Sequence, residues 1–326
     1  MKTKILQKLK ETEGYISGQE LCDVLGISRT AVWKYMNKLK EEGYQIEAIP
    51  NKGYHLLHVP DVLTESEIKS RLCTKWAGKE IHCYERVDST NQAAKHAAEQ
   101  GSLHGALFLA EQQSSGKGRR GRSWVSPKGT GIWMTILLRP QLEPSYASML
   151  TLVAALSMSK AIEKETGLKA QIKWPNDVVI NGKKVCGILT EMSAEMEWIH
   201  YVIIGLGTNA NIEEFPEEIQ KKATSLKLES GKEVERVPVI CAFLSYFEKD
   251  YENFMIYQNL LGLLEEYNER LVNCEQEVRI LDSKGEYTGV AKGVDASGAL
   301  IVRKEKGETV KITSGEVSVR GIYGYV

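Results

Sequence analysis

The stretch from Ser17 to Gly43 constrains the fold of this chain more than any other feature of the sequence. Apolar residues recur at helical spacing on both sides of Gly26, and glycine is the residue that a tight turn between two helices favours. Ser17 and Ser28 stand where each helix would need an N-cap. The pattern predicts two helices joined by a short turn, preceded by another helix over residues 3–11.

The two faces of these predicted helices differ in chemistry. Apolar residues give each helix an inward face, made of Leu21, Val24 and Leu25 in the first and of Val32, Tyr35, Met36 and Leu39 in the second. The stretch from Arg29 to Lys40 carries four basic residues and no acidic one. Cations neutralise phosphates, and Arg, Asn and Thr can read base edges, so the second helix has the composition of a DNA-recognition helix.

A β-hairpin is predicted directly after the helices, because residues 45–49 alternate, residues 50–53 form a turn and residues 54–58 return. The helix pair alone would also suit a small dimerisation or adaptor module. Helix pair, basic second helix and hairpin in this order are typical of a winged helix-turn-helix that binds DNA. The predicted DNA-contacting residues are Ser28, Arg29, Thr30, Trp33, Lys34, Asn37, Lys38 and Lys52. Residues 1–60 hold nine Lys/Arg against seven Asp/Glu, so a dimer that reads two half-sites is expected.

The overall composition excludes several classes of protein. The net charge of −1 means that any nucleic-acid binding must come from a local patch. The six cysteines are scattered without a C-x-x-C pair, which indicates reduced thiols rather than a disulfide scaffold or a zinc site. The N-terminus lacks the apolar core of a signal peptide, and the uncharged run over residues 145–159 is too short and too rich in Ser/Thr to span a membrane. We expect a cytoplasmic protein with no membrane partner, and a buried helix over this run.

Three domains are predicted, over residues 1–60, 61–271 and 272–326. Residues 59–64 resemble a linker, and T-E-S-E from Thr64 is a capping box that opens a new helix. In the second domain, hairpins and short strands stand between helices, and Asn181–Gly182 is a strong hairpin signal, so an α+β fold with a mixed sheet is expected. The third domain shows short strands with glycine turns, which predict a small SH3-like β-barrel.

The segment from Ser114 to Trp124 is the first motif with chemical content. Three glycines and four cations lie within residues 116–122, where backbone N–H groups and positive charge could hold a triphosphate and the pyrophosphate that develops from it. The segment is neither a Walker loop nor a G-x-G-x-x-G turn before a helix. A basic loop that touches nucleic acid is the alternative.

Three further segments carry polar groups at element ends. Lys173 and the pair Lys183/Lys184 flank a tight turn and could hold a carboxylate or a phosphate, although an ordinary surface hairpin has the same pattern. Glycines and asparagines over residues 203–211 allow close approach of a ligand, or simply mark a bulged strand. Residues 88–91 place hydroxyl and amide groups at a helix N-terminus, which suits a polar ligand or a plain N-cap.

Taken in order, these segments resemble one family. D-S-T-N-Q, then G-K-G-R-R-G-R-x-W, then K-W-P-N-D with K-x-x-G-I-L-x-E, then G-x-G-x-N-x-N follow one another as in the biotin protein ligases. With the N-terminal winged helix, the chain is similar to the bacterial bifunctional ligase and biotin-operon repressor, the BirA type. The resemblance covers essentially the whole chain. The related lipoate ligases share the catalytic fold but not this combination.

The resemblance implies a reaction in two steps. Biotin would attack the α-phosphorus of ATP, with Mg²⁺ accompanying the nucleotide, to give biotinyl-5′-adenylate and pyrophosphate. A lysine of a biotin carboxyl carrier protein domain would then attack the adenylate. This scheme needs no enzyme nucleophile, so catalysis would rest on orientation and charge neutralisation. Biotinyl-adenylate would also act as corepressor by promoting a homodimer that binds operator DNA.

The resemblance also assigns roles to individual residues. The predicted catalytic residues are Arg119, Lys184 and Asp177, with Lys183 as the alternative to Lys184. The residues expected against the biotin ring system are Ser89, Thr90, Asn91 and Gln113. Other predicted ligand-binding residues are Gly116, Lys117, Gly118, Arg122, Trp124 (near adenine), Lys173, Asn176, Gly187, Gly205, Gly207, Asn209 and, toward ATP, Arg320. No metal-ligating side chain is predicted.

Two other functions fit parts of the same pattern. A lipoate or other acyl-adenylate ligase would use a similar loop and sheet. A ligand-sensing repressor that binds an adenylate without ligation would use the same head.

Overall fold

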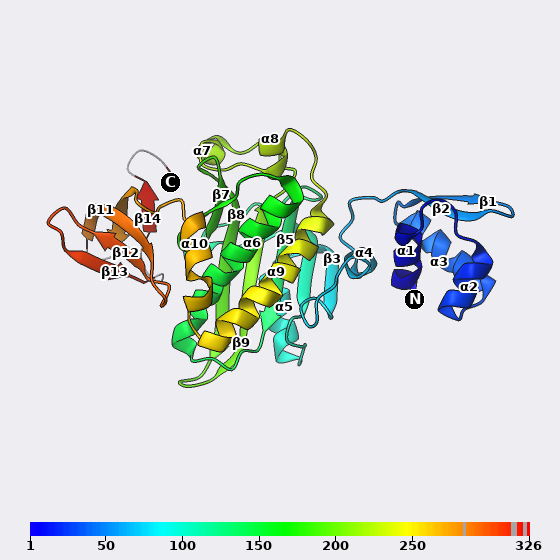
Figure 1. Ribbon diagram of the computed structural model, residues 1–326, viewed down its shortest axis with the longest axis horizontal. Helices are drawn as coiled ribbons and strands as arrows, with labels where there is room; N and C mark the ends of the chain where they lie inside the picture. The colour runs from blue at the N-terminus through cyan, green and yellow to red at the C-terminus, as the bar shows by residue number, and fades with distance from the viewer. Residues whose placement is uncertain (283–284, 314–317, 322–324) are drawn as a thin grey trace. The chain divides into compact units, whose positions relative to one another are not determined.

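The computed structural model describes residues 1–282, 285–313, 318–321 and 325–326. Contacts divide the chain into two compact units (Figure 1). One unit comprises Met1–Cys73 and Glu235–Cys241, and the other comprises Thr74–Val234 and Ala242–Val326.

The first unit begins with the predicted head. Its elements are α1 (Lys2–Glu11), α2 (Gly18–Leu25), α3 (Arg29–Glu41), β1 (Gln45–Ile49) and β2 (Gly53–His58). Both predicted caps form, because Ser17 Oγ accepts the Glu20 N–H at 3.0 Å and Ser28 Oγ accepts the Ala31 N–H at 3.2 Å. Gly26 ends α2 in the left-handed region, at φ 65°. Helix pair, turn and antiparallel hairpin confirm the winged helix-turn-helix architecture.

The core of the head comes from one face of each helix and from the hairpin. The fully buried members of this core include Ile5, Leu6, Leu21, Val32, Met36 and Leu39. Leu25 and Tyr35 pack partly buried against them, as predicted. Val24 was predicted on the same inward face, but it is 56% exposed. Its position lies too far around the short helix to reach the core that Leu21 defines.

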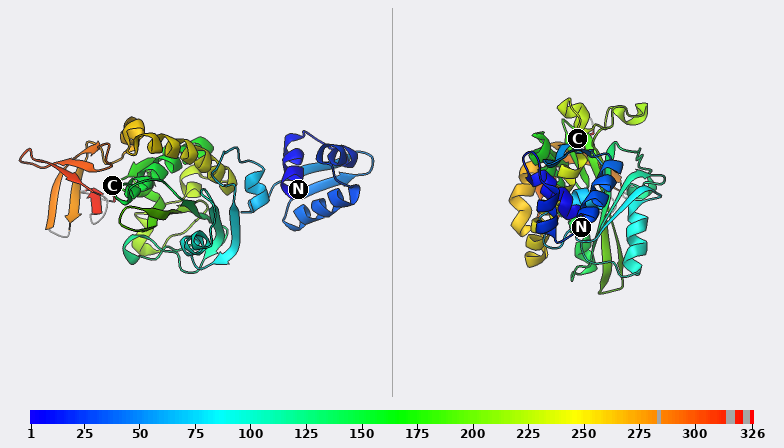
Figure 2. Two further views of the ribbon diagram at one scale, coloured as in Figure 1. Left: turned by 90° about the horizontal axis from the view of Figure 1, so that it is seen from below. Right: turned by 90° about the vertical axis from the view of Figure 1, so that its right-hand side faces the viewer.

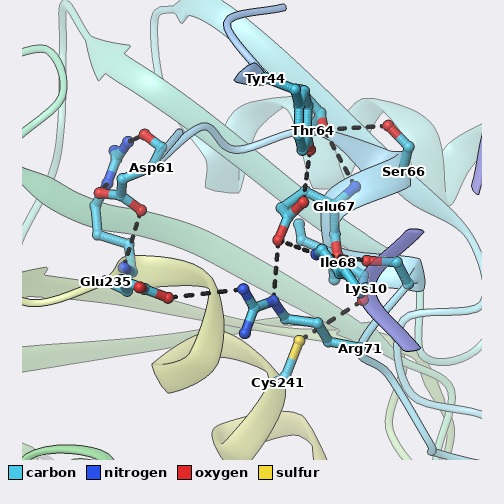
Figure 3. A network of polar contacts seen from close by, with 12 residues as sticks. Lys10, Tyr44, Asp61, Thr64, Ser66, Glu67, Ile68, Arg71, Glu235 and Cys241 are labelled. Carbon is cyan, nitrogen blue, oxygen red and sulfur yellow. Dashed lines mark hydrogen bonds and ion pairs between the residues drawn. The ribbon is translucent and has the colours of Figure 1, made fainter. Parts of the chain in front are cut away.

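A buried carboxylate connects the head to the next helix, α4 (Glu65–Lys69). Glu67 in α4 is 1% exposed, and it pairs with Lys10 of α1 (Figure 3). Tyr44, which follows α3, donates to Glu67 at 2.5 Å. Arg71 donates to the other carboxylate oxygen at 2.9 Å. The carboxylate thus joins three segments that lie far apart in the sequence.

The predicted capping box forms only in part. Thr64 Oγ1 accepts the Glu67 N–H at 3.2 Å, as an N-cap should. The Glu67 carboxylate does not return to the Thr64 N–H, which donates instead to Val62 O at 3.1 Å. The charged partners Lys10 and Arg71 outcompete a neutral amide for this carboxylate because hydrogen bonds between ions are stronger.

The second unit is built on a seven-stranded sheet. In spatial order its strands are β3 (Ile81–Val87), β4 (Leu107–Gln113), β5 (Gly131–Leu138), β9 (Ile199–Asn209), β8 (Lys183–Ala194), β7 (Asp177–Ile180) and β6 (Gln171–Lys173). Strands β3 and β4 run parallel, and every other neighbouring pair is antiparallel. The predicted mixed sheet is therefore confirmed.

Helices cover both faces of this sheet. The two long ones, α6 (Leu150–Thr166) and α9 (Arg236–Tyr257), lie on one side, and α5 (Thr90–Glu99) lies on the other (Figure 2). All eight residues of β5 are buried, as expected for a strand covered on both faces. The remaining helices are short: α7 (Glu217–Gln220), α8 (Leu226–Ser230), α10 (Leu264–Arg270) and the 3₁₀ turns η1 (Arg119–Gly121), η2 (Pro144–Met149) and η3 (Leu261–Leu263).

Two local predictions for this unit hold. Asn181 and Gly182, at φ 49° and 74°, form the turn between β7 and β8. The stretch Pro144–Thr166 is long and apolar enough to cross a membrane by composition, but 72% of its most apolar window is buried inside the protein. It is the buried helix that the sequence predicts.

The C-terminal strands form an antiparallel sheet, as the strand pattern predicts. Its strands are β10 (Glu277–Asp282), β11 (Gly285–Val294), β12 (Leu300–Arg303), β13 (Thr309–Ile312) and β14 (Ser318–Gly321). They are ordered β13-β12-β11-β10-β14, so the last strand returns to pair with the first. This return brings the end of the chain back to the second unit's main sheet, where Val326 lies near the Asn181–Gly182 turn.

Candidate functional site

Two glycines of β9 open the surface of the main sheet. A Cβ at Gly205 would lie 2.1 Å from Asn91 Oδ1, and one at Gly207 would lie 2.5 Å from Trp124 Nε1. Both distances are shorter than any real contact, so only glycine lets these two side chains approach the strand. The positions at which the sequence shows G-x-G thus bring an amide and an indole onto the sheet.

The start of α5 forms the polar wall of this site. Ser89, Thr90 and Asn91 are all less than a tenth exposed. Gln113 Oε1 accepts the Thr90 N–H at 2.9 Å, and Asn91 Nδ2 donates to Glu191 at 2.7 Å. These bonds fix the direction of each amide group, so the wall presents its donors and acceptors in a set arrangement.

The Gly/Arg loop lies over the other side. Trp124 N–H donates to Gly116 O at 2.8 Å, and a Cβ at Gly116 would lie 2.5 Å from Trp124 O, so the base of the loop closes tightly. Arg119 Nη1 donates to Asn176 Oδ1 at 2.8 Å. Burial lowers the pKa of Arg119 from its ordinary value, although nearby Asp177 opposes this shift. A partly dehydrated guanidinium interacts more strongly with an anion than one in water.

The residues that flank the turn between β6 and β7, together with the start of β8, supply a second group of charges. Lys184 Nζ lies 2.5 Å from Asp177 Oδ1 and 5.1 Å from the centre of the Trp124 ring. Lys173 is 5% exposed, and its Nζ lies 3.3 Å from the centre of the Tyr325 ring. Asn176 O accepts the Ile188 N–H at 2.9 Å, and Asn176 Nδ2 donates to Ile188 O at 3.0 Å, which holds the turn against β8.

These groups surround two adjoining hollows. The inner pocket is lined mainly by α5, Gln113 and the sheet glycines, and the outer cleft has a volume of about 460 Å³. Residues that line both are Gly118, Arg119, Trp124, Asn176 and Lys184. A largely polar pocket thus opens past two cations, Arg119 and Lys184, into a larger cleft, which suits a small ligand joined to a phosphate-bearing one.

Comparison with known proteins agrees with this geometry. Residues 83–209 match the biotin/lipoate A/B protein ligase family, residues 2–55 match an HTH domain, and residues 274–320 match the biotin protein ligase C-terminal domain. The chain is 40% identical over 308 residues to the bifunctional ligase/repressor BirA of Bacillus spizizenii, covering 94% of each. The chain belongs to the bifunctional ligase/repressor BirA family.

Other BirA-family relatives extend this result. The Escherichia coli bifunctional ligase/repressor BirA is 29% identical, over 93% of this chain and 92% of its own length. A solved structure of biotin protein ligase from Aquifex aeolicus in complex with biotin and ATP matches with a TM-score of 0.66 and 32% identity. That match covers 74% of this chain and 99% of the other.

The structure brings most of the predicted site residues together. Those that line the two hollows are Ser89, Thr90, Asn91, Gln113, Lys117, Gly118, Arg119, Arg122, Trp124, Lys173, Asn176, Asp177, Lys184, Gly187, Gly205, Gly207 and Asn209. Gly116 lies behind the loop against Trp124 O. Arg320 belongs to β14, but its side chain lies outside the described residues. Lys184 lines both hollows, whereas Lys183 is exposed.

Sequence reasoning missed several residues of this site. Ser126 accepts a hydrogen bond from Gln113 at 2.9 Å, and Thr135 Oγ1 lies 2.6 Å from Asn91 Oδ1. The stretch 212–223, with Phe215 and Ile219, forms one side of the outer cleft. Thr135 had a signal, since it is a polar residue in an otherwise apolar strand. The stretch 212–223 had none, because its place depends on tertiary packing.

The predicted DNA-contacting face of α3 is open to solvent. Arg29, Thr30, Lys34 and Lys38 are exposed, Trp33 is 61% exposed, and Asn37 is half-buried. Lys52, between the hairpin strands, is exposed as well. Ser28 is occupied as the cap of α3, so any contact that it makes with a phosphate would be shared with this role.

Proposed function

We propose that this BirA-family protein is a biotin–protein ligase that joins biotin to ATP as biotinyl-5′-adenylate and then transfers biotin to a carrier-protein lysine. The single observation that carries the proposal is the ring formed by Arg119, Lys184 and Trp124 between a polar pocket and a larger cleft. The named relatives are ligases, and one solved neighbour holds biotin and ATP. The biotin ring system would occupy the inner pocket and the nucleotide the outer cleft.

The first step forms a bond between a biotin carboxylate oxygen and the α-phosphorus of ATP, while the bond to pyrophosphate breaks. Both reactants are anions, so their approach requires positive charge close to both. Arg119 and Lys184 are held by Asn176 and Asp177, respectively, and need not reorganise when charge develops on the phosphate. Because the two ligands would bind in adjoining hollows, the biotin carboxylate and the α-phosphorus of ATP would lie close together.

In the second step the amine of a carrier lysine attacks the biotinyl carbonyl, and AMP leaves. Lys184 would stabilise the negative charge that develops on the carbonyl oxygen or on the departing phosphate. The Trp124 indole N–H is buried without a hydrogen-bond partner among the residues that the structure describes, so it is available as a donor to a ligand. The carrier would enter from the open side of the outer cleft.

Mg²⁺ would enter with the nucleotide. The described part of the chain holds no cluster of three or more His, Cys, Asp or Glu side chains that could bind a metal ion. This donor set fits an ion carried mainly by phosphates and water, which is how Mg²⁺ usually binds in nucleotide sites. When bound it neutralises phosphate charge.

A carrier-labelling assay tests the enzyme half. Purified protein, biotin and ATP are incubated with a biotin carboxyl carrier protein domain, and the mass of the carrier is measured. We expect the mass of one biotin to be added, and none when the carrier's acceptor lysine is replaced. Labelling by lipoate in place of biotin would instead support a lipoate ligase. No labelling with either would contradict ligation.

The head carries the second half of the proposal, repression of transcription. Its capped α3 presents Arg29, Lys34 and Lys38 to solvent, beside a hairpin with exposed Lys52. Two such heads in a cytoplasmic homodimer, formed when biotinyl-adenylate is bound, would read a two-fold operator.

Operator binding measured by fluorescence anisotropy, with and without biotin and ATP, tests this half. We expect tighter binding with both present, and equal affinities would contradict a corepressor role. The Lys34→Ala variant should weaken binding and lower by about one the magnitude of the slope of log K against log salt concentration. Lys79→Ala, an exposed lysine of the other unit, is the matched control and should bind as the wild type does.

A further inference from the structure

The penultimate residue of the chain lies in the ligand cleft. Tyr325 lines the outer cleft together with Lys173, Asp177 and Lys184. Its hydroxyl donates to Asp177 Oδ2, and its ring lies under the Lys173 ammonium at 3.3 Å. One side chain from the C-terminus therefore contacts two of the charged groups that flank the W-P-N-D turn.

The contact with Asp177 fixes a carboxylate that already holds a lysine. Asp177 Oδ1 lies 2.5 Å from Lys184 Nζ, and Tyr325 occupies the second oxygen. A carboxylate that is ion-paired through Oδ1 and hydrogen-bonded through Oδ2 is restrained about its terminal bond, so the position of the Lys184 ammonium is restrained as well. The phenol also takes up part of the negative charge of Asp177, which leaves Lys184 freer to attract a substrate anion.

The contact between Tyr325 and Lys173 stabilises a second cation. Lys173 is 5% exposed, and an ammonium removed from water needs compensating partners. The face of an aromatic ring supplies negative electrostatic potential to such an ion. Tyr325 thereby helps to keep a second positive charge at the border of the cleft.

The last residue of the chain, Val326, packs closely against its neighbours. A Cβ at Gly321 would lie 1.8 Å from Val326 O, and one at Gly182 would lie 3.1 Å from Val326 Cγ2. Val326 therefore fits between the end of β14 and the turn that joins β7 to β8. This seat lies beside the β7 strand that begins at Asp177.

We propose that Tyr325 is a positioning residue for adenylate formation, acting through Asp177 on Lys184 and directly on Lys173. The inference rests on the proposed ligase function and deepens it. Tyr325 should affect the handling of the nucleoside triphosphate, because the three charged groups that it connects border the cleft assigned to the nucleotide. Binding of biotin itself should not depend on Tyr325, since this residue does not line the inner pocket.

The test measures biotin-dependent pyrophosphate release by full-length protein at varied ATP. Tyr325→Phe removes the hydroxyl but keeps the ring, and should lower kcat about tenfold, the usual effect of one hydrogen bond to a charged group. KM for biotin should not change. Tyr325→Ala removes both contacts, so it should lower kcat further and raise KM for ATP. Gly321→Ala should act like Tyr325→Ala by displacing Val326.

Tyr287, in β11 of the C-terminal sheet, offers a matched control. Lys304 Nζ also lies over its ring, 4.9 Å from the ring centre, but Tyr287 does not line either hollow. Tyr287→Phe should leave kcat and both KM values at wild-type levels. If Tyr325→Phe behaves in the same way, the proposal is wrong.

A double substitution separates positioning from a general structural role. If Tyr325 acts through Asp177, Tyr325→Phe should lower kcat much less in an Asp177→Asn background than in the wild type. Equal reductions in both backgrounds would overturn the proposed route. A wild-type protein that releases no pyrophosphate with biotin and ATP would contradict the ligase function itself, independently of Tyr325.

Discussion

Two carboxylates in this molecule are surrounded in similar ways but differ in what they leave open. Glu67 pairs with Lys10 and Arg71 and accepts a bond from Tyr44, while Asp177 pairs with Lys184 and accepts a bond from Tyr325. The Glu67 side chain is 1% exposed, and the Asp177 side chain is 14% exposed at the border of a cleft of about 460 Å³.

The difference shows that the same set of side chains can serve structure or chemistry. Around Glu67 the partners fill the space and Glu235 also pairs with Arg71, so the charges neutralise one another and hold segments together. Around Asp177 the cations outnumber the acid and face a hollow, so positive charge remains for a ligand. Residue types alone do not separate these two cases, whereas the volume beside them does.

The largest expected effect concerns the open cluster. Lys184→Ala should slow adenylate formation by about 10²–10³-fold, as loss of one preorganised electrostatic group does in other enzymes. Its effect on thermal stability should be small, because Lys184 is partly exposed. Pyrophosphate release and a melting curve measure the two effects. Lys183→Ala, at the exposed neighbouring position, is the control and should retain full activity.

The closed cluster should respond in the opposite way. Glu67→Gln leaves Lys10 without its counter-ion and Arg71 with only the more distant Glu235, so it should destabilise the first unit by about 3 kcal/mol, as expected when a buried pair loses one member. Hydrogen exchange of α1 and α3 measures this loss, and ligation should persist. Glu65→Gln is the control, since its pair with Lys69 is exposed and of little energetic value. Equal exchange in both variants would show that the Glu67 cluster is not structural.

A glycine of the inner pocket gives an intermediate effect. Gly205→Ala places a methyl group 2.1 Å from Asn91 Oδ1, so the amide must move and its bond to Glu191 must weaken. We expect KM for biotin to rise about tenfold, the value of one lost hydrogen bond, with KM for ATP unchanged. Gly18→Ala, where the new Cβ meets Tyr54 at an ordinary 3.6 Å, should alter neither. An unchanged KM for biotin would remove Asn91 from the biotin site.

The smallest effect is a pH dependence of the closed cluster. Burial alone would raise the pKa of Glu67, but hydrogen bonds from Lys10 and Tyr44 hold it below its usual value. A carboxylate with a lowered pKa stabilises the fold above its unfolded pKa of about 4.3, and this contribution is lost as pH falls through the folded pKa.

Unfolding of the wild type and of Glu67→Gln can be compared between about pH 6 and about pH 3. Below the unfolded pKa, the free energy of unfolding of the wild type should fall by up to about 1.4 kcal/mol more per pH unit than that of Glu67→Gln. Parallel curves would mean that Glu67 titrates alike in the folded and unfolded chain.

Local signals in the sequence predicted the parts of this molecule that are locally determined. Ser17, Gly26 and Ser28 mark the helix ends of the head, and Asn181–Gly182 marks a hairpin, because caps and tight turns depend on a few neighbouring residues. Hairpins and short strands between helices predicted the mixed sheet, and the family resemblance named the groups that lie around its glycines.

What the sequence did not reveal depends on contacts between distant segments. Glu67 has the spacing of a capping-box acid, but its charge is satisfied by Lys10, which is far away in sequence. Val24 follows the apolar spacing of α2 and is nevertheless exposed, because it lies on the other side of Leu21 from Cys22 and Leu25, which face the core. Tyr325 carries no motif, and only the return of the last strand brings it to Asp177.

Helix α9 has a consequence for dissecting the protein into fragments. Its first residues, 236–241, belong to the first unit, where Arg236 is 2% exposed and donates to Asp61 at 2.7 Å, and the rest belongs to the second. Deleting the DNA-binding head together with residues 61–73 would remove Asp61, the partner of the buried Arg236 guanidinium at the beginning of a long core helix. A minimal ligase made from this chain should therefore retain residues 61–73, and proteolytic trimming should stop before them.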